Sequence, residues 1–270
     1  MEEKYNLEFS QLLSLCEKKI MAKVSSKPGP IQGAFNGGDY LGRPGKDIFF
    51  ALSKLTKEQM LQLADVHSNQ YPFEAPNNHV GFAACIRYIY GQFEKQGVLR
   101  SEEDSSRMQK NGVDWSRPRV FLDMLKDKFF EKNNYYGLCI WYEMEAHRLG
   151  DEGFLYKDHD KIVLMEETYM KSVDYAYKCN SLKQMFTPYY WAFRYFEKLE
   201  NHDKALSYSI ICLSQMEKHC PSPKQGYAVK AEDCCRYIKK NHPGKWGEIS
   251  DFYNKNSKNN CVKNAVKVYS

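Results

Sequence analysis

Glutamate and histidine side chains that could bind metal ions are concentrated in the middle of the chain. Glu143, Glu145 and His147 follow one another closely, and Glu166 and Glu167 lie in the next predicted helix. Carboxylate-bridged di-metal bundles take inward-pointing ligands from Glu-x-x-His motifs, in which the two residues are three apart. Here Glu143 and His147 are four apart, and no Glu-x-x-His motif supplies a second pair. We therefore expect no metal site, and we expect Glu145 to be held by a partner or to lie at the edge of its helix face.

A stretch rich in glycine and proline, residues 25–47, holds six of the sixteen glycines and three of the ten prolines. This composition predicts a long loop, and long loops are often functional. Part of it, Gly-Arg-Pro-Gly-Lys at 42–46, differs from a phosphate-binding loop, which has four residues between its glycines and Ser or Thr after its lysine. We expect no nucleotide site here. The loop's candidate partner-binding residues are Asp39, Tyr40, Arg43 and Lys46.

The segment Arg-Tyr-Ile-Lys-Lys-Asn-His ends at His242 and places five residues between Arg236 and that histidine. This spacing resembles the motif of the HEPN helical ribonucleases. The resemblance implies that His242 would act in acid–base chemistry and that Arg236 would stabilise phosphate charge. Tyr237 stands where that family usually has a polar residue. The resemblance gives one of two hypotheses for the function of this chain, namely a helical endoribonuclease. In such an enzyme the side chains of Arg236 and His242 would converge on an open, electropositive cleft.

The nine cysteines are odd in number and widely spaced, and no two of them form a Cys-x-x-Cys pair. Most of them fall within apolar patterns typical of helices, where cysteine behaves as a small apolar side chain. The sequence begins MEEKYNLEF, which lacks the apolar stretch of a secretory signal. No apolar run approaches the roughly 18 residues of a membrane helix. We expect buried, reduced thiols in a cytoplasmic protein without membrane contact, and we expect no cofactor.

The net charge of +5 is unevenly distributed. Residues 224–270 hold ten Lys or Arg and four acidic residues, a net charge of +6, which leaves −1 for residues 1–223. A basic C-terminal region could contact nucleic acid or an acidic partner. The lysines are spread out, however, which favours an ordinary solvated surface with a loose tail.

Apolar residues recur every three or four positions, and no strand-like alternation extends beyond four residues. The fold class expected is all-α, with a helical bundle in the N-terminal half and helical hairpins in the C-terminal half. The domains expected are an N-terminal helical region at 1–112, a helical-hairpin region at 113–255 and a basic tail at 256–270. Capping and periodicity predict helices at 5–24, 47–55, 57–69, 79–96, 116–132, 135–149, 160–179, 187–200, 203–219, 223–240 and 245–254.

One hairpin, residues 187–220, resembles a tetratricopeptide repeat. Phe196 matches the aromatic residue of the first helix, and Ala205 matches the small residue where the two helices touch. A small residue at a helix crossing lets the axes approach to about 8–9 Å. Phe193 stands where the family has a small residue, and no second repeat follows in register. The resemblance implies a helical hairpin in a solenoid-like or bundle stack.

The same resemblance implies that the first helix lines a concave surface, with three side chains facing the groove. Aromatic and cationic side chains suit an acidic peptide or a carboxylate terminus. No catalytic signature beyond the Arg236 and His242 spacing stands out. We therefore expect a non-catalytic adaptor or regulatory protein that binds another protein or peptide, through Tyr190, Arg194 and Lys198. The competing expectation is that Tyr190 packs in the core and both cations are merely solvated.

Overall fold

The computed structural model describes residues 9–10, 54–69, 116–220 and 225–270. Nine α-helices and no strands occur in this part of the chain, which confirms the all-α prediction. The helices expected at 5–24, 47–55 and 79–96 lie almost wholly outside it. The chain divides into two compact units, Met1–Asp158 and His159–Ser270. The domain ranges expected from the sequence remain predictions.

The first unit contains α4 (Lys57–Asn69), α7 (Ser116–Glu131) and α8 (Tyr135–Tyr156). A capping box formed by Thr56 and Gln59 begins α4, within the range 57–69 expected for this helix. The amide of Gln59 donates to Thr56 Oγ1 at 3.2 Å, and the amide of Thr56 donates to Gln59 Oε1 at 2.9 Å. This reciprocal pair satisfies two backbone donors that a helix N-terminus otherwise leaves without partners.

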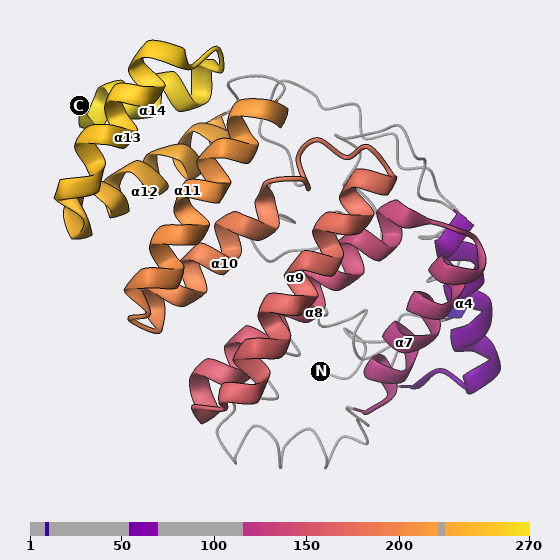
Figure 1. The fold of residues 1–270 in the computed structure, drawn as a ribbon. Coiled ribbons are helices and arrows are strands. Elements are labelled where there is room, and N and C mark those ends of the chain that lie inside the picture. The colour runs from indigo at the N-terminus through magenta and orange to yellow at the C-terminus, as the bar shows by residue number, and fades with distance from the viewer. Residues whose placement is uncertain (1–8, 11–53, 70–115, 221–224) are drawn as a thin grey trace, which may run out of the picture. The chain divides into compact units, whose positions relative to one another are not determined.

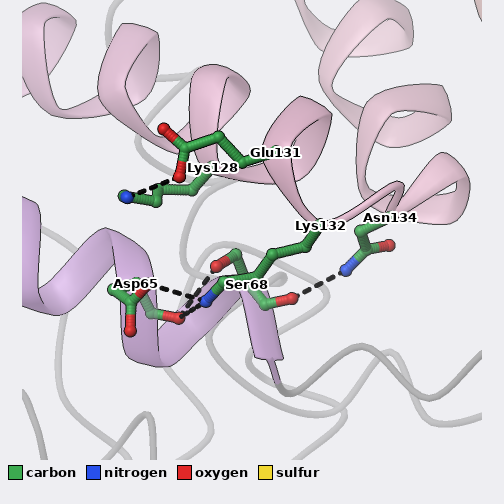
Figure 2. A network of polar contacts seen from close by, with 6 residues as sticks. All are labelled: Asp65, Ser68, Lys128, Glu131, Lys132 and Asn134. Atoms are coloured by element: carbon green, nitrogen blue, oxygen red, sulfur yellow. Dashed lines mark hydrogen bonds and ion pairs between the residues drawn. The ribbon is translucent and has the colours of Figure 1, made fainter.

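Polar contacts fix α4 to the turn between α7 and α8 (Figure 2). Lys132 Nζ lies 2.8 Å from Asp65 Oδ1 and donates to the Asp65 carbonyl at 2.7 Å. Asn134 Nδ2 donates to the Ser68 carbonyl at 2.9 Å, while its Oδ1 accepts from the Gly137 amide and caps α8. One short turn therefore holds three helices together.

Helix α8 is longer than the sequence predicts. The expected end was residue 149, where Gly150 interrupts the apolar pattern, but the helix continues to Tyr156. It ends at Lys157, whose left-handed backbone directs its amide to the Gly153 carbonyl. Glycine in a helix costs only about 1 kcal/mol relative to alanine, which is too little to end a helix by itself. The prediction was wrong because it treated one glycine as a stop.

The second unit contains six helices that pack largely in chain order (Figure 1). Helix α10 packs on α9 and α11, α12 packs on α11, and both α13 and α14 pack on α12. Five of the six were expected from the sequence, with ends within three residues of those observed. Their bounds are α9 (His159–Lys178), α10 (Thr187–Lys198), α11 (His202–His219), α12 (Gln225–Asn241), α13 (Pro243–Asn256) and α14 (Asn260–Tyr269).

Residues Asn260–Tyr269, within the region expected to be a basic tail at 256–270, form helix α14. Asn259 caps it by accepting from the Cys261 amide at 3.0 Å. One side of the helix is buried, and its lysines lie among exposed or half-buried positions, which is why composition alone suggested a tail. The buried residues are Cys261, Val262, Ala265 and Val266.

Helix α10 begins at Thr187, as the expected range 187–200 does, and its N-cap residue Phe186 makes no side-chain cap hydrogen bond. The Thr187 hydroxyl instead donates backward to the Lys183 carbonyl at 2.8 Å. Pro188 still occupies the first turn, where its missing amide costs nothing.

The core of the second unit is aromatic. Phe193, expected to disturb the approach of α10 and α11, is fully buried, and its ring lies 5.1 Å from that of Tyr237 on α12. Phe196 stacks on Tyr208 of α11 with ring centroids 5.5 Å apart, next to the fully buried Ala205. Aromatic rings from α10 thus fill the space toward both following helices.

Candidate functional site

Side chains from α10 and α12 converge on one carboxylate, that of Asp233. We call Tyr190, Arg194, Lys230, Asp233 and Arg236 the Asp233 cluster. The first two lie one helical turn apart on α10, and the other three lie at successive three-residue steps on α12. Residues three or four apart share a helix face, so each helix presents its part of the cluster on one side.

The Asp233 carboxylate accepts from both helices. The hydroxyl of Tyr190 donates to Oδ2 at 2.6 Å, and the Arg236 guanidinium pairs with Oδ1. Arg194 Nη1 lies 3.7 Å from Oδ2 and 3.3 Å from a Glu197 carboxylate oxygen. The Asp233 side chain is only 12% exposed, against 57% for Arg236. A largely covered acid therefore positions cations that reach solvent.

The Tyr190 hydroxyl keeps its proton at neutral pH and can donate a hydrogen bond. Burial, and then the hydrogen bond to Asp233, raise the pKa of Tyr190 well above its ordinary value near 10. Ionisation would place a second negative charge beside the carboxylate. The hydroxyl therefore keeps its proton, and the link between α10 and α12 is present throughout the physiological pH range.

Lys230 adds a cation above two aromatic rings. Its ammonium nitrogen lies 3.9 Å from the centroid of the Tyr190 ring and 4.7 Å from that of the Trp191 ring. Ring faces carry negative charge and attract such a cation. The cluster as a whole contains three cations and one acid, so it is positively charged.

Of the three side chains predicted to face a groove, two lie together and the third lies apart from them. Tyr190 and Arg194 meet at Asp233, although Tyr190 is only 7% exposed. Lys198 is exposed, and its ammonium lies 5.4 Å from the centroid of the Tyr195 ring. The four candidates of the glycine-rich loop, Asp39, Tyr40, Arg43 and Lys46, lie outside the described residues.

Arg236 and His242 contact different residues. Arg236 pairs with Asp233, whereas the ring of His242 lies 5.8 Å from that of Tyr237, between α12 and α13. Nε2 of His242 is buried and has no hydrogen-bond partner. No hydrogen bond or ion pair of the described residues joins the arginine to the histidine.

Two acidic residues of α8, Glu145 and Glu152, are held by an arginine. Arg148 makes a two-point contact with Glu145, at 2.7 and 3.0 Å, and pairs with Glu152 at 2.5 Å. Burial alone would lower the pKa of Arg148, but these carboxylates outweigh burial and raise it. The expected pairing of Glu145 is confirmed. Within the described residues, no group of three His, Cys, Asp or Glu side chains is arranged to hold a metal ion.

Seven cysteines lie in the described part of the chain; none is disulfide-bonded, and six are buried. The expectation of buried cysteines is confirmed for those six, while Cys179 is half-buried. Burial, and then contact with Cys212, raise the pKa of Cys234 well above that of an ordinary thiol. That thiol is therefore a poor nucleophile.

Sequence reasoning missed the centre of the cluster. Asp233 was counted only as one acid in a basic region, and Lys230 and Trp191 were not singled out. The spacing of Lys230, Asp233 and Arg236 places Asp233 beside each of the two cations on the helix surface, which is a pattern visible in the sequence. Which element that surface meets is not visible there, because α10 and α12 are separated by a whole helix.

Comparison with protein-family models, with curated proteins and with solved structures finds no match for this chain. Among the helices that the structure describes, none is both long enough and apolar enough to cross a membrane.

Proposed function

We propose that this protein is a non-catalytic adaptor or regulatory protein that binds an acidic segment of another protein at the Asp233 cluster. The observation that carries the proposal is the arrangement around Asp233. One covered carboxylate pairs with Arg236 and lies 3.7 Å from Arg194 Nη1 on the other helix, and both guanidinium groups remain partly exposed. Cations held in place in this way lose little conformational freedom when a partner binds.

The two arginines have donors to spare. A guanidinium carries five N–H groups, and carboxylates bind it best through two parallel hydrogen bonds. Arg194, whose side chain is 33% exposed, lies at 3.3 Å or more from its two acidic neighbours. Arg236 is more exposed still, and Asp233 is its ion-pair partner. An incoming carboxylate can therefore bind both groups without displacing Asp233.

The aromatic part of the cluster supplies apolar contact area beside the charges. Trp191 is half-buried, and Lys230 lies over both its ring and that of Tyr190. Interfaces are rich in tryptophan, tyrosine and arginine because these side chains combine large contact area with hydrogen bonding. The surface thus favours a peptide with acidic residues next to apolar ones.

A tetratricopeptide-like hairpin remains part of this proposal. Phe196 and Ala205, on which the resemblance rests, are both buried where α10 and α11 pack together. Among the contacts that join α10 to α12, the ring of Phe193 packs against that of Tyr237, and the hydroxyl of Tyr190 donates to Asp233. These contacts support a stack in which α10 and α12 share one surface.

The endoribonuclease alternative has weaker support. Arg236 is engaged by Asp233, and the buried Nε2 of His242 is not placed to exchange a proton with a substrate. We expect no RNA cleavage by the purified protein, and no change in that result for His242→Ala.

The test is affinity purification from the native cell, with the full chain as bait. The test variant is the double substitution Arg194→Gln and Arg236→Gln. The control variant is Lys171→Gln and Lys245→Gln, which removes the same charge from exposed positions on α9 and α13. Captured proteins are identified by mass spectrometry and are then bound as purified partners at several salt concentrations.

The proposal expects a partner retained by the wild type and the control variant and reduced about tenfold or more with the Arg194 and Arg236 variant. Binding of the partner should weaken as salt rises, because the contact is between charges. Equal capture by the test and control variants would contradict the proposal, provided that circular dichroism shows both to be folded.

A further inference from the structure

The turn between α13 and α14 is fixed to the end of α11 by a carboxylate. Glu217 accepts from the Ser257 hydroxyl at 2.6 Å and from the backbone amides of Lys258 and Asn259 at 2.7 and 3.1 Å. A carboxylate with three donors holds such a turn firmly. The start of α14 is therefore set by α11, far away in the sequence.

Asn259 binds the backbone on both sides of this joint. Its Nδ2 donates to the carbonyls of Met216 and Cys220, at 3.1 and 2.9 Å, and its Oδ1 accepts from the Cys261 amide at 3.0 Å. One side chain therefore positions the two backbone segments that carry Cys220 and Cys261.

The two thiols held by this joint touch. Cys220 Sγ and Cys261 Sγ are 3.6 Å apart, and both residues are buried. A disulfide bond is about 2.05 Å long, so the sulfurs need to approach by roughly 1.5 Å to form one.

We propose that Cys220 and Cys261 form a reversible disulfide in the folded protein when a peroxide oxidises it, and that this bond staples α14 to the end of α11. One thiol attacks the peroxide and becomes a sulfenic acid, releasing one water. The sulfur of the other thiol then attacks the sulfenic sulfur, forms the S–S bond and releases a second water. Two thiols and one hydrogen peroxide give one disulfide and two waters. Cys220 is the more exposed of the two residues, at 8% against 2% for Cys261.

The bond would close a span of 41 residues that includes α12 and α13. A cross-link over such a span removes conformational freedom mainly from the unfolded chain. Helix α14 packs against α12, which carries Lys230, Asp233 and Arg236. Oxidation would therefore stabilise the helix that supports the Asp233 cluster, whatever that cluster binds. A thiol reductant reverses the change.

The experiment treats the full, reduced chain with increasing hydrogen peroxide, then unfolds it in guanidinium chloride and blocks the remaining thiols with N-ethylmaleimide. The digest is then analysed by mass spectrometry without reduction. The expected result is a linked peptide pair containing Cys220 and Cys261 as the main disulfide, absent after dithiothreitol. Hydrogen exchange of the α14 amides should slow about tenfold or more in the oxidised protein. The Cys179→Ser variant, which loses a half-buried thiol elsewhere, should behave like the wild type.

Two results would overturn the proposal. One is that Cys220 and Cys261 remain labelled by N-ethylmaleimide at peroxide concentrations that oxidise Cys179. The other is that they pair with different cysteines, such as Cys212 or Cys234. Both results come from the wild-type protein, so neither depends on whether a Cys220 or Cys261 variant folds.

Discussion

The hydroxyl oxygen of Tyr190 lies 2.6 Å from Oδ2 of Asp233, and this hydrogen bond joins two helices between which a whole helix intervenes in the chain. The same carboxylate pairs with Arg236 on its own helix. Asp233 thus links the packing of α10 and α12 to the placement of cations on their shared surface. Stability and binding should respond together when this contact is changed.

Tyr190→Phe removes only the hydroxyl that Asp233 accepts. A hydrogen bond to a charged group contributes about 1.5–3 kcal/mol, so we expect a loss of that size in the free energy of unfolding. Urea unfolding followed by circular dichroism measures it. The control is Tyr189→Phe, since Tyr189 stacks on Tyr208 through its ring and makes no hydrogen bond through its hydroxyl among the described contacts. Equal losses in the two variants would mean that the Asp233 contact contributes nothing.

Buried tyrosines should make the protein sensitive to alkali. Burial raises the pKa of Tyr190, Tyr208 and Tyr253, and carboxylates nearby, Asp233, Glu166 and Glu217 respectively, raise each pKa further. A pKa raised in the folded state means that the folded protein holds its proton longer than the unfolded chain. This contribution to stability is complete below about pH 10 and is lost as pH rises above it, by about 1.4 kcal/mol per pH unit for each tyrosine.

The measurement is urea unfolding at several pH values from 8 to about 11. Tyr208→Phe removes one of the three groups, together with its hydrogen bond to Glu166 at 2.5 Å. We expect this variant to be less stable than the wild type at pH 8 and to lose stability less steeply above pH 10. Parallel curves for the variant and the wild type would contradict the prediction.

Local sequence patterns predicted the described helices well, because the spacing of apolar residues indicates which side of a helix is buried. The capping box of Thr56 and Gln59 depends on residues three apart, and the structure forms both of its hydrogen bonds. Helix ends were harder where glycine interrupted the pattern, as at Gly150. Helix α14 was missed because its high proportion of lysine obscured the apolar positions at 261, 262, 265 and 266, which repeat at helical spacing.

The sequence predicts only some of the residues of the candidate site. Tyr190 and Arg194 follow from the hairpin resemblance, but the partner that brings them together, Asp233, comes from another helix. A single sequence shows which residues share a helix face and does not show which face meets which. That information lies in the packing of α10, α11 and α12 around buried rings such as those of Phe193 and Tyr237.

Gly137 lies where two helices approach too closely for any side chain. A Cβ atom at this position would be 2.5 Å from two ring atoms of Phe129, which is itself buried. Gly137→Ala should therefore lower the free energy of unfolding by about 1–3 kcal/mol despite the better helix propensity of alanine. Gly247→Ala on α13 is the matched control, because nothing lies within 4 Å of its added methyl group.

For Gly247→Ala we expect the opposite sign, a gain of about 0.5–1 kcal/mol from helix propensity alone. Urea unfolding of both variants gives the comparison. If both substitutions stabilised the protein, the approach of α8 to Phe129 would be looser than the structure indicates.

The last helix offers a direct test of whether residues 256–270 are packed or form a tail. Val266 is fully buried and Val268 is 69% exposed, although they are only two residues apart on α14. Val266→Ala should lower the free energy of unfolding by about 2 kcal/mol, because it removes two buried methyl groups and leaves a small cavity. Val268→Ala should change it by less than about 0.5 kcal/mol. Hydrogen exchange of α12 and α14 peptides, measured alongside urea unfolding, should be faster in the Val266 variant alone. A loose tail would show equal, negligible effects for both substitutions and rapid exchange of α14 in the wild type.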